Sequence, residues 1–254
     1  MKLRILGSGT SSGVPRLGPD WGACDPDEPR NRRTRASLLV EHRDARILID
    51  TSPDMREQLL AAGVDRLDAV IWTHDHADHC HGIDDLRQVF HALGRPVPVY
   101  ARAPVLAALR QRFAYIFNGK AGYPAVVDAS ELSETLMLGD VRIDTVDQPH
   151  GRISSAGLRF VADGKSAGYA TDFHDLTPEM RTLYSDLDLW ILDALRHAPH
   201  PSHPTVASAL QWIAELAPGR AALIHMDHSL DYRTLANALP PGVEPGYDGL
   251  EFTL

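Results

Sequence analysis

The sequence contains little cysteine and no long apolar run. Only two of its 254 residues are cysteines, Cys24 and Cys80, too few for a disulfide-stapled extracellular scaffold, so a reducing cytoplasm is expected. No segment approaches the roughly 20 consecutive apolar residues of a membrane span. The N-terminal strand-like segment reaches Gly7 too early to contain the apolar region of a signal peptide. We therefore expect a cytoplasmic protein without a membrane partner.

Basic charge is also scarce. The chain has 25 lysines and arginines against 34 aspartates and glutamates, a formal net charge of -9. A protein that binds many phosphates of a nucleic acid normally presents a basic face. The one basic cluster here is short, and a solvated loop is its simplest interpretation; its members are Arg30, Arg32, Arg33 and Arg35. The composition therefore argues against a nucleic-acid partner and favours a small molecule.

The remaining pattern alternates short apolar strands with amphipathic helices. Strand-like runs occupy 3–6, 37–41, 46–50, 68–73, 97–100, 141–146, 158–162, 166–171, 187–192 and 221–224. Helical spacing occupies 53–63, 84–93, 103–113, 205–217 and 232–239. Both halves of the chain follow this pattern and no linker separates them. We predict one α/β (α+β) domain over residues 1–254, with two mixed β-sheets packed face to face and helices outside.

Two irregular segments interrupt this pattern. Residues 7–15 form a loop of small residues that larger side chains could not make so tight. Residues 117–124 are less regular and are a candidate lid over a functional site.

The most specific signal is segment 73–79, which contains His-x-His-x-Asp-His at His74, His76, Asp78 and His79. Imidazole and carboxylate suit zinc, manganese and iron. Alternate positions leaving a strand place His74 and His76 on one side of the backbone, so Asp78 and His79, after the turn, can face a second ion. A catalytic ion needs about three protein ligands and an open position for water. Four residues are too few for two ions, so further ligands must come from elsewhere in the chain.

Three residues of metal-binding type follow apolar strands: His150, Asp172 and His225. A single histidine after a strand more often lies at the surface or forms an ordinary hydrogen bond. Three such positions in a chain that also contains segment 73–79 reverse that expectation. Asp50 ends another apolar run, and we interpret it as orienting a ligand histidine through the ring nitrogen that does not face the metal.

The order of these residues resembles that of the metallo-β-lactamase superfamily of two-metal hydrolases, and the resemblance spans nearly the whole chain. It implies a four-layer αββα sandwich and two divalent ions per chain, Zn²⁺, Mn²⁺ or Fe²⁺. The ligands of the first ion would be His74, His76 and His150. The second ion would be bound by Asp78, His79 and His225, and Asp172 would bridge the two.

Finer motifs resemble the PhnP family of phosphodiesterases, which open a cyclic phosphate of a phosphoribosyl compound and are related to the tRNA-processing ribonuclease Z. These motifs lie at 7–15, 21–22, 81–84, 202–205 and 246–251. The family has a cysteine cluster after its Trp-Gly that builds a structural zinc site, whereas this sequence has only Cys24 there. We therefore expect no cysteine-rich zinc site. Arg32, Arg33 and Arg35 lie where the family also has arginines, which leaves a phosphate-facing role open.

The resemblance implies hydrolysis of a small (cyclic) phosphodiester such as a phosphoribosyl cyclic phosphate or a nucleotide. Asp78 would orient or deprotonate the attacking water, and His203 would protonate the leaving oxygen. An ordinary helix entry capped by a neighbouring hydroxyl is the alternative interpretation of the segment around His203, and His200 is its nearest competitor as the acid. The expected substrate contacts are His228, His200, Ser11 and Ser12.

Other activities remain open for such a centre. They include tRNA 3′-end processing, hydrolysis of a thioester or lactone, and metal binding without turnover on the same fold. Relatives commonly form dimers, so a homodimer is a further expectation.

Overall fold

The computed structural model describes all 254 residues and contains two seven-stranded β-sheets packed face to face. The first sheet contains β1 (Lys2–Gly7), β2 (Ser37–His42), β3 (Ala45–Ile49), β4 (Ala69–Ile71), β5 (Val97–Ala101), β6 (Val127–Glu131) and β14 (Glu251–Thr253). The second contains β7 (Thr135–Leu138), β8 (Val141–His150), β9 (Ile153–Ala162), β10 (Lys165–Ala170), β11 (Leu189–Asp193), β12 (Arg220–Ile224) and β13 (Val243–Pro245). The strand orders are β14-β1-β2-β3-β4-β5-β6 and β13-β12-β11-β10-β9-β8-β7.

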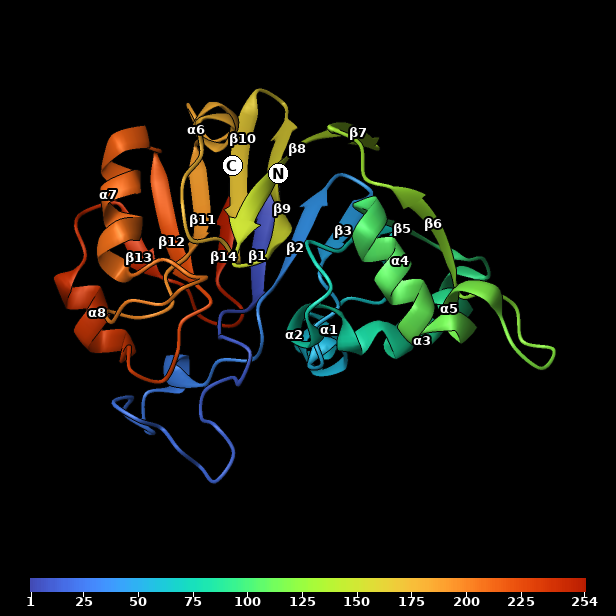
Figure 1. The fold of residues 1–254 in the computed structure, drawn as a ribbon, viewed down its shortest axis with the longest axis horizontal. Helices are drawn as coiled ribbons and strands as arrows, with labels where there is room; N and C mark the ends of the chain where they lie inside the picture. Colours follow the sequence, from blue (N-terminus) through green and yellow to red (C-terminus); the bar gives the residue numbers. More distant parts are fainter.

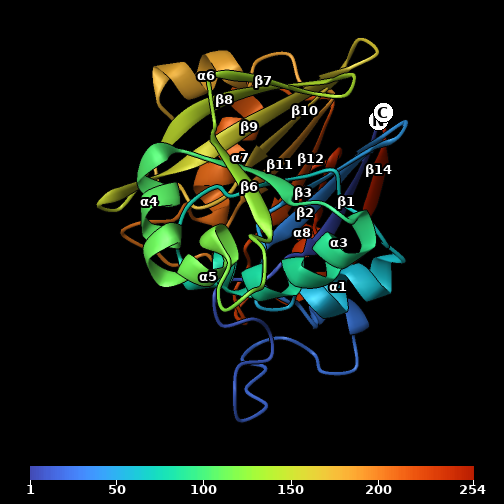
Figure 2. The same cartoon turned by 90° about the vertical axis from the view of Figure 1, so that its right-hand side faces the viewer.

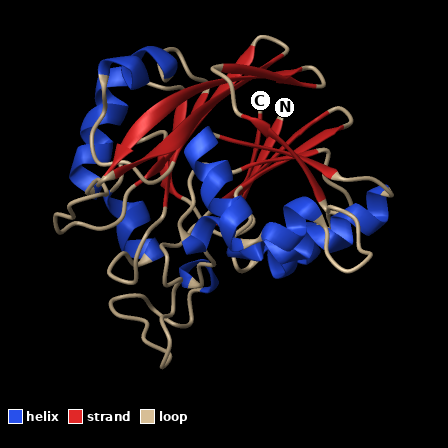
Figure 3. Cartoon of the chain, turned by 45° about the vertical axis from the view of Figure 1, so that its right-hand side comes forward, coloured by secondary structure: helices blue, strands red, loops and turns tan.

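Helices cover the outer face of each sheet, which gives four layers (Figures 1 and 3). The first sheet is covered by α1 (Met55–Ala62), α3 (Leu86–Leu93), α4 (Ala103–Arg112) and α5 (Ala114–Asn118). The second is covered by α6 (Pro178–Leu183), α7 (Val206–Leu216) and α8 (Tyr232–Ala238). The short helices α2 (Ala77–Cys80) and η2 (His81–Asp85) lead from β4 to α3, and η1 (Pro29–Asn31) lies in the N-terminal loop. This arrangement confirms the predicted αββα sandwich. None of the helices has the length and apolar character needed to cross a membrane.

Successive side chains of the central strands point to opposite faces of the sheet, and both faces are apolar. In β2, Leu38 and Val40 belong to the apolar cluster between the sheets, whereas Leu39 packs with Leu48 of β3 in the cluster beneath the helices. Because both faces are covered, both sets of side chains can be apolar, which is why these strands appear as nearly continuous apolar runs.

Left-handed residues lie in the β2–β3 turn and at the end of helix α1. Strands β2 and β3 pair antiparallel around the turn at Arg43, which has a φ of 51°. Helix α1 ends at Gly63, whose φ of 65° is the left-handed conformation that glycine adopts without steric cost.

The structure adds elements that the apolar patterns did not indicate: the strands β6, β7, β13 and β14, and the helices η1, α2, η2, α5 and α6. Strands β13 and β14 have three residues each and lie at sheet edges, and three residues are too few for an alternating pattern to be recognised. Strand β14 pairs with β1, so the two termini lie side by side (Figure 2), and the Met1 amino group donates to the Leu254 carbonyl at 2.9 Å.

Candidate metal centre

The candidate ligands meet because several strands end at the same edge of the sandwich. Strands β10, β11 and β12 are mutually parallel, and β8 has the same direction because it is antiparallel to β9, which is antiparallel to β10. Three residues just after strand ends have positive φ angles. They are Asp50 after β3 at 64°, Asp172 after β10 at 56° and His225 after β12 at 57°. Asp and His tolerate this region better than most residues, and its occurrence here turns their side chains toward one point.

The first group contains His74, His76, His150 and Asp172, with one potential ligand atom from each, all within 4.8 Å of one another. Nε2 of His150 lies 3.3 Å from Nδ1 of His76 and 3.5 Å from Oδ1 of Asp172. Nε2 of His74 lies 3.8 Å from the same carboxylate oxygen. The structure thus brings together the whole set expected for the first ion, plus the carboxylate expected to be shared.

The second group contains Asp78, His79 and His225, whose ligand atoms also lie within 4.8 Å of one another. Oδ2 of Asp78 is 3.3 Å from Nε2 of His79 and 3.6 Å from Nε2 of His225. The same two imidazole nitrogens lie 3.1 Å and 3.5 Å from Oδ2 of Asp172. Asp172 therefore presents one oxygen to each group, which is the geometry of a bridging carboxylate.

Hydrogen bonds on the outer side of the cluster leave several imidazole nitrogens that face its centre without a partner. Nδ1 of His74 is 3.0 Å from the Thr73 hydroxyl, and Nδ1 of His150 is 3.0 Å from the Ser202 carbonyl. Nε2 of His74, His79 and His225 is buried and has no hydrogen-bond partner. Burying a polar atom without a partner costs free energy, so several orphaned nitrogens at one point are a strong indication of a ligand. Nitrogen and oxygen donors in this number fit Zn²⁺, Mn²⁺ or Fe²⁺.

The electrostatics of the centre also favour a cation. Burial by itself raises the pKa of Asp172, but the surrounding imidazoles of His225, His79 and His74 outweigh it and hold the pKa well below its usual range. For His79 burial lowers the pKa, but the carboxylates around it prevail and raise the pKa well above its usual range. The centre is therefore a buried cluster of ionised carboxylates that positive charge stabilises.

Asp50 contacts the side of the His79 ring that faces away from Asp78 and Asp172. Its Oδ2 lies 2.7 Å from Nδ1 of His79, and its two oxygens accept hydrogen bonds from the Thr73 amide at 2.7 Å and the Thr73 hydroxyl at 2.8 Å. These contacts fix the ring so that Nε2 faces Asp78 and Asp172. A carboxylate in this position also raises the basicity of the facing nitrogen.

Sequence reasoning missed Asp193, the last residue of β11. This fully buried carboxylate places Oδ2 2.7 Å from Nδ1 of His203, and the same oxygen accepts a hydrogen bond from the Asp172 amide at 3.1 Å. It ends an apolar strand, the signal by which Asp50 was selected, so the pattern could have identified it.

His203 lies against both groups. Its ring stacks on that of His225 with centroids 4.8 Å apart, and its Nε2 is 3.9 Å from Oδ1 of Asp172. One potential ligand atom of His203 lies within 4.8 Å of those of Asp172 and His225, so proximity alone also permits a ligand role. Because Nδ1 is engaged by Asp193, Nε2 is the atom that faces the centre.

The other expected substrate contacts lie at different distances from this centre. The His200 ring is beside that of His203, with centroids 5.0 Å apart. His228 belongs to none of the groups of clustered ligand atoms, and its Nε2 is 3.4 Å from Oδ2 of Asp20. Ser11 and Ser12 are exposed and line a cavity of about 990 Å³ that reaches Asp78.

The arginines of the N-terminal loop lie in two different environments. The Arg33 guanidinium is buried and donates to the carbonyls of Leu230 at 2.6 Å and Asp227 at 3.1 Å, so it ties this loop to the segment after β12. Arg32 and Arg35 instead line the cavity beside Asp78. The Cys24 thiol is buried nearby and donates to the carbonyl of Leu230 at 3.4 Å.

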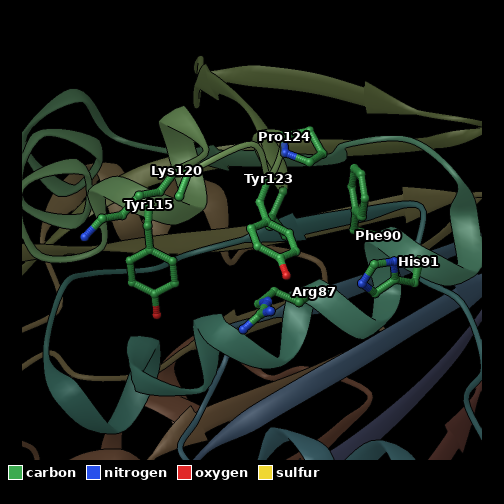
Figure 4. A pocket seen from close by; sticks show the side chains of 9 residues that line it. Arg87, Phe90, His91, Tyr115, Lys120, Tyr123 and Pro124 are labelled. Atoms are coloured by element: carbon green, nitrogen blue, oxygen red, sulfur yellow. The ribbon is translucent and has the colours of Figure 1, made fainter.

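The candidate lid does not cover the histidine cluster. Four residues of this segment line a separate cavity of about 270 Å³ together with side chains of α3 and α5; they are Lys120, Ala121, Tyr123 and Pro124. Figure 4 shows the Tyr123 ring facing Arg87 and Phe90 in this cavity, which none of the candidate ligands lines. The lid prediction is therefore wrong: the return from α5 to β6 places this segment at the outer edge of the first sheet (Figure 1).

Comparisons with known proteins agree with this geometry. A solved diphosphatase of the PhnP family is 35% identical, has a TM-score of 0.91, and is matched over 99% of this chain and 96% of that one. Zn²⁺-bound PqqB from Methylobacterium extorquens is 20% identical with a TM-score of 0.83 and full coverage of both chains, which shows the shared fold.

A curated relative and a family model complete the comparison. The octanoyltransferase of Porphyromonas gingivalis is 37% identical over 259 residues; the match covers 99% of this chain and 51% of that protein, so the chain spans about half the length of this relative. A model described as a β-lactamase superfamily domain matches residues 45–226. With the donor set described above, these matches place the chain in the metallo-β-lactamase superfamily of metal-dependent hydrolases, in the branch that contains the PhnP family.

Proposed function

We propose that this protein is a phosphodiesterase that hydrolyses small phosphodiesters, including cyclic ones, with two divalent ions. The observation that carries the proposal is the placement of His203, whose Nδ1 is held by Asp193 at 2.7 Å while its Nε2 faces the candidate metal centre. The likeness to a PhnP-family diphosphatase supports phosphorus chemistry, and the acidic chain supports a small substrate over a nucleic acid.

The ligand assignment follows the two groups. His74, His76 and His150 would bind one ion, Asp78, His79 and His225 the other, and Asp172 would be shared between them. Bound divalent ions lower the pKa of water toward neutrality and polarise phosphoryl oxygens. Zn²⁺, Mn²⁺ and Fe²⁺ are all compatible with these donors.

Asp78 has the position to orient the attacking water. Its Oδ2 faces the imidazoles of His79 and His225. Burial alone raises its pKa, but these imidazoles outweigh that effect and lower the pKa, so the side chain stays ionised and accepts hydrogen bonds. An ionised carboxylate beside the reaction centre can hold a water molecule by one of its protons while the oxygen faces phosphorus.

His203 supplies the proton that the leaving oxygen needs. An alkoxide is a poor leaving group, so protonation as the P–O bond breaks lowers the barrier. The Asp193 carboxylate contacts Nδ1 of His203 and orients the ring so that Nε2 lies on the side of the centre, where it can donate a proton. This donor favours a phosphodiester over a thioester, because a thiolate leaves without protonation.

The test is a screen of the metal-loaded enzyme against cyclic nucleotides, phosphoribosyl cyclic phosphate, linear diesters, a thioester, a lactone and a structured RNA. We expect turnover of the small phosphodiesters alone. His203→Ala should reduce turnover of alkyl diesters by about a hundredfold or more and that of bis(p-nitrophenyl) phosphate much less, since nitrophenolate needs no proton.

Three results would contradict the proposal. Thioester or lactone hydrolysis without phosphodiester hydrolysis would assign the centre to acyl chemistry, and RNA cleavage would assign it to tRNA processing. Stoichiometric metal without any turnover would indicate a binding protein. If His203→Ala kept its bound metal and full activity on alkyl diesters, the proton donor would be another residue.

A further inference from the structure

A series of buried polar side chains leads from the end of α6 to the backbone of Asp172. Its members are Tyr184, Gln148 and Ser155, which have no part in the proposed reaction. Tyr184 directly follows α6, whereas Gln148 and Ser155 lie opposite each other in the β8–β9 pair. Burying a polar group costs free energy unless the group is hydrogen-bonded, so three such side chains in contact indicate a specific role.

The contacts fix the direction of each hydrogen bond in this series. Nε2 of Gln148 lies 3.0 Å from the Thr171 carbonyl, which only accepts, so its second proton is the one donated to the Ser155 hydroxyl at 3.0 Å. That hydroxyl has one proton of its own, and its nearest carbonyl is that of Asp172 at 2.8 Å. Oε1 of Gln148 is the nearest acceptor for the Tyr184 hydroxyl, at 2.9 Å. The three side chains thus form a relay that ends on the Asp172 carbonyl.

The relay holds the peptide groups on both sides of the Asp172 Cα atom. The Thr171 carbonyl accepts from Gln148, and the Asp172 carbonyl accepts from Ser155. The Asp172 amide is held as well, since it donates to Asp193 at 3.1 Å. A φ of 56° costs an aspartate free energy and persists only where the surrounding contacts enforce it. These contacts therefore select the conformation that directs the Asp172 carboxylate between the two groups of ligand atoms.

The second sheet leaves room for the relay at Gly157, in the middle of β9. A Cβ atom at this position would lie 2.2 Å from the Tyr184 hydroxyl oxygen and 2.7 Å from Oε1 of Gln148, too close for any side chain. Gly157 does not have a positive φ, so its own backbone conformation does not require glycine. A glycine inside a strand has no side chain to pack and weakens the strand, so the close approach of the relay is the physical reason for it.

We propose that Tyr184, Gln148 and Ser155 are positioning residues of the metal centre, which hold Asp172 in the left-handed conformation that lets its carboxylate serve both ions. The inference rests on the two-ion part of the proposed function and is independent of the substrate. None of the hydrogen bonds of the relay goes to the side chain of a candidate ligand, so the relay acts through the backbone of Thr171 and Asp172.

The test measures the Zn²⁺ affinity of the full chain by competition with a chromophoric chelator. Ser155→Ala removes the hydrogen bond to the Asp172 carbonyl and little volume. We expect about a tenfold loss of Zn²⁺ affinity, the low end of the range for removing a group that orients a metal ligand. Tyr184→Phe removes one oxygen at the far end of the relay. It should weaken the affinity about threefold, because the Gln148 amide then loses the contact that orients it.

Ser166→Ala is the matched control. Ser166 is also a buried serine of the second sheet, and its hydroxyl donates to the Asp186 carbonyl at 3.1 Å. Asp186 is likewise a left-handed aspartate, with a φ of 53°, but it belongs to none of the groups of clustered ligand atoms. Both serine variants should lower the Tm of the metal-free protein by about 2–4 °C, the effect of one lost hydrogen bond. Only Ser155→Ala should also lose Zn²⁺ affinity.

Two results would overturn the proposal. Unchanged Zn²⁺ affinity in Ser155→Ala or in Tyr184→Phe would mean that the relay supports the fold and not the metal centre. A loss of affinity in Ser166→Ala as large as that in Ser155→Ala would mean that the effect follows from stability alone.

Failure of the proposed function gives a different result. If the wild-type protein binds no Zn²⁺, the two-ion assignment is wrong, and the relay is tested by crystal structures of the wild-type and Ser155→Ala proteins. A negative φ at Asp172 in the variant alone would retain the relay as the cause of the left-handed conformation. A positive φ in both proteins would overturn it.

Discussion

Asp193→Asn is the substitution that most directly tests the role of the buried carboxylate behind His203. Oδ2 of Asp193 accepts from Nδ1 of His203 and from the Asp172 amide, whereas Oδ1 is buried without a hydrogen-bond partner. An asparagine can place its oxygen at the position of Oδ2 and its amino group at the position of Oδ1. The substitution therefore retains the shape and both hydrogen bonds but removes the negative charge.

The magnitude follows from the charge alone, because both hydrogen bonds are kept. A hydrogen bond to a carboxylate contributes about 1 to 2 kcal/mol more than one to a neutral amide, which corresponds to about a fivefold to 30-fold lower kcat if proton donation limits the rate. We expect this loss for uridine 2′,3′-cyclic phosphate, whose leaving group is an alkoxide. For bis(p-nitrophenyl) phosphate the loss should be about threefold or less, because the leaving group needs no proton.

The assay compares kcat for both substrates at equal metal content, determined by elemental analysis of each variant. His203→Ala and the double variant Asp193→Asn/His203→Ala complete a double-mutant cycle with the wild-type enzyme and Asp193→Asn. If the two residues act as one unit, the double variant should be no slower than His203→Ala alone. Equal losses on both substrates, or additive losses in the cycle, would refute the reasoning, since Asp193 would then act on the metal centre and not through His203.

The remaining predictions concern the metal centre and the thiols. Chelation of the bound ions should lower the Tm by about 5 °C or more, because the ions bind the orphaned nitrogens of the folded state only; calorimetric scans before and after chelation measure this, and an unchanged Tm would argue against a resident metal. Asp50→Ala should weaken metal affinity about tenfold to a hundredfold by releasing the His79 ring, as measured by competition with a chromophoric chelator; unchanged affinity would mean that the ring is fixed by other contacts. Burial raises the pKa of the Cys80 thiol to about 12 and also raises that of Cys24, so both should be protonated at pH 8 and react slowly with a thiol reagent until the protein unfolds; rapid reaction in the native state would contradict the buried positions.

The sequence by itself determined the sandwich and most of the candidate centre. Nearly continuous apolar runs specify strands buried on both faces, and parallel strands of one sheet end at the same edge. Asp172 and His225, which follow two such strands of the second sheet, therefore lie at one edge, and the packing of the two sheets brings segment 73–79 beside them. Local chemistry carried this information, because a strand and the residue that ends it are neighbours in the chain.

The tertiary structure alone decided which partners these residues and the loop arginines meet. Asp193 and His203 face each other because β11 and the turn before α7 converge on the edge of the second sheet, and nothing in their own neighbourhoods indicates that pairing. Arg33 is buried and Arg32 is exposed although they are adjacent, because the segment after β12, some two hundred residues away, presents its carbonyls to only one of them. Contacts between distant segments depend on the packing of the whole chain, and a local pattern does not encode them.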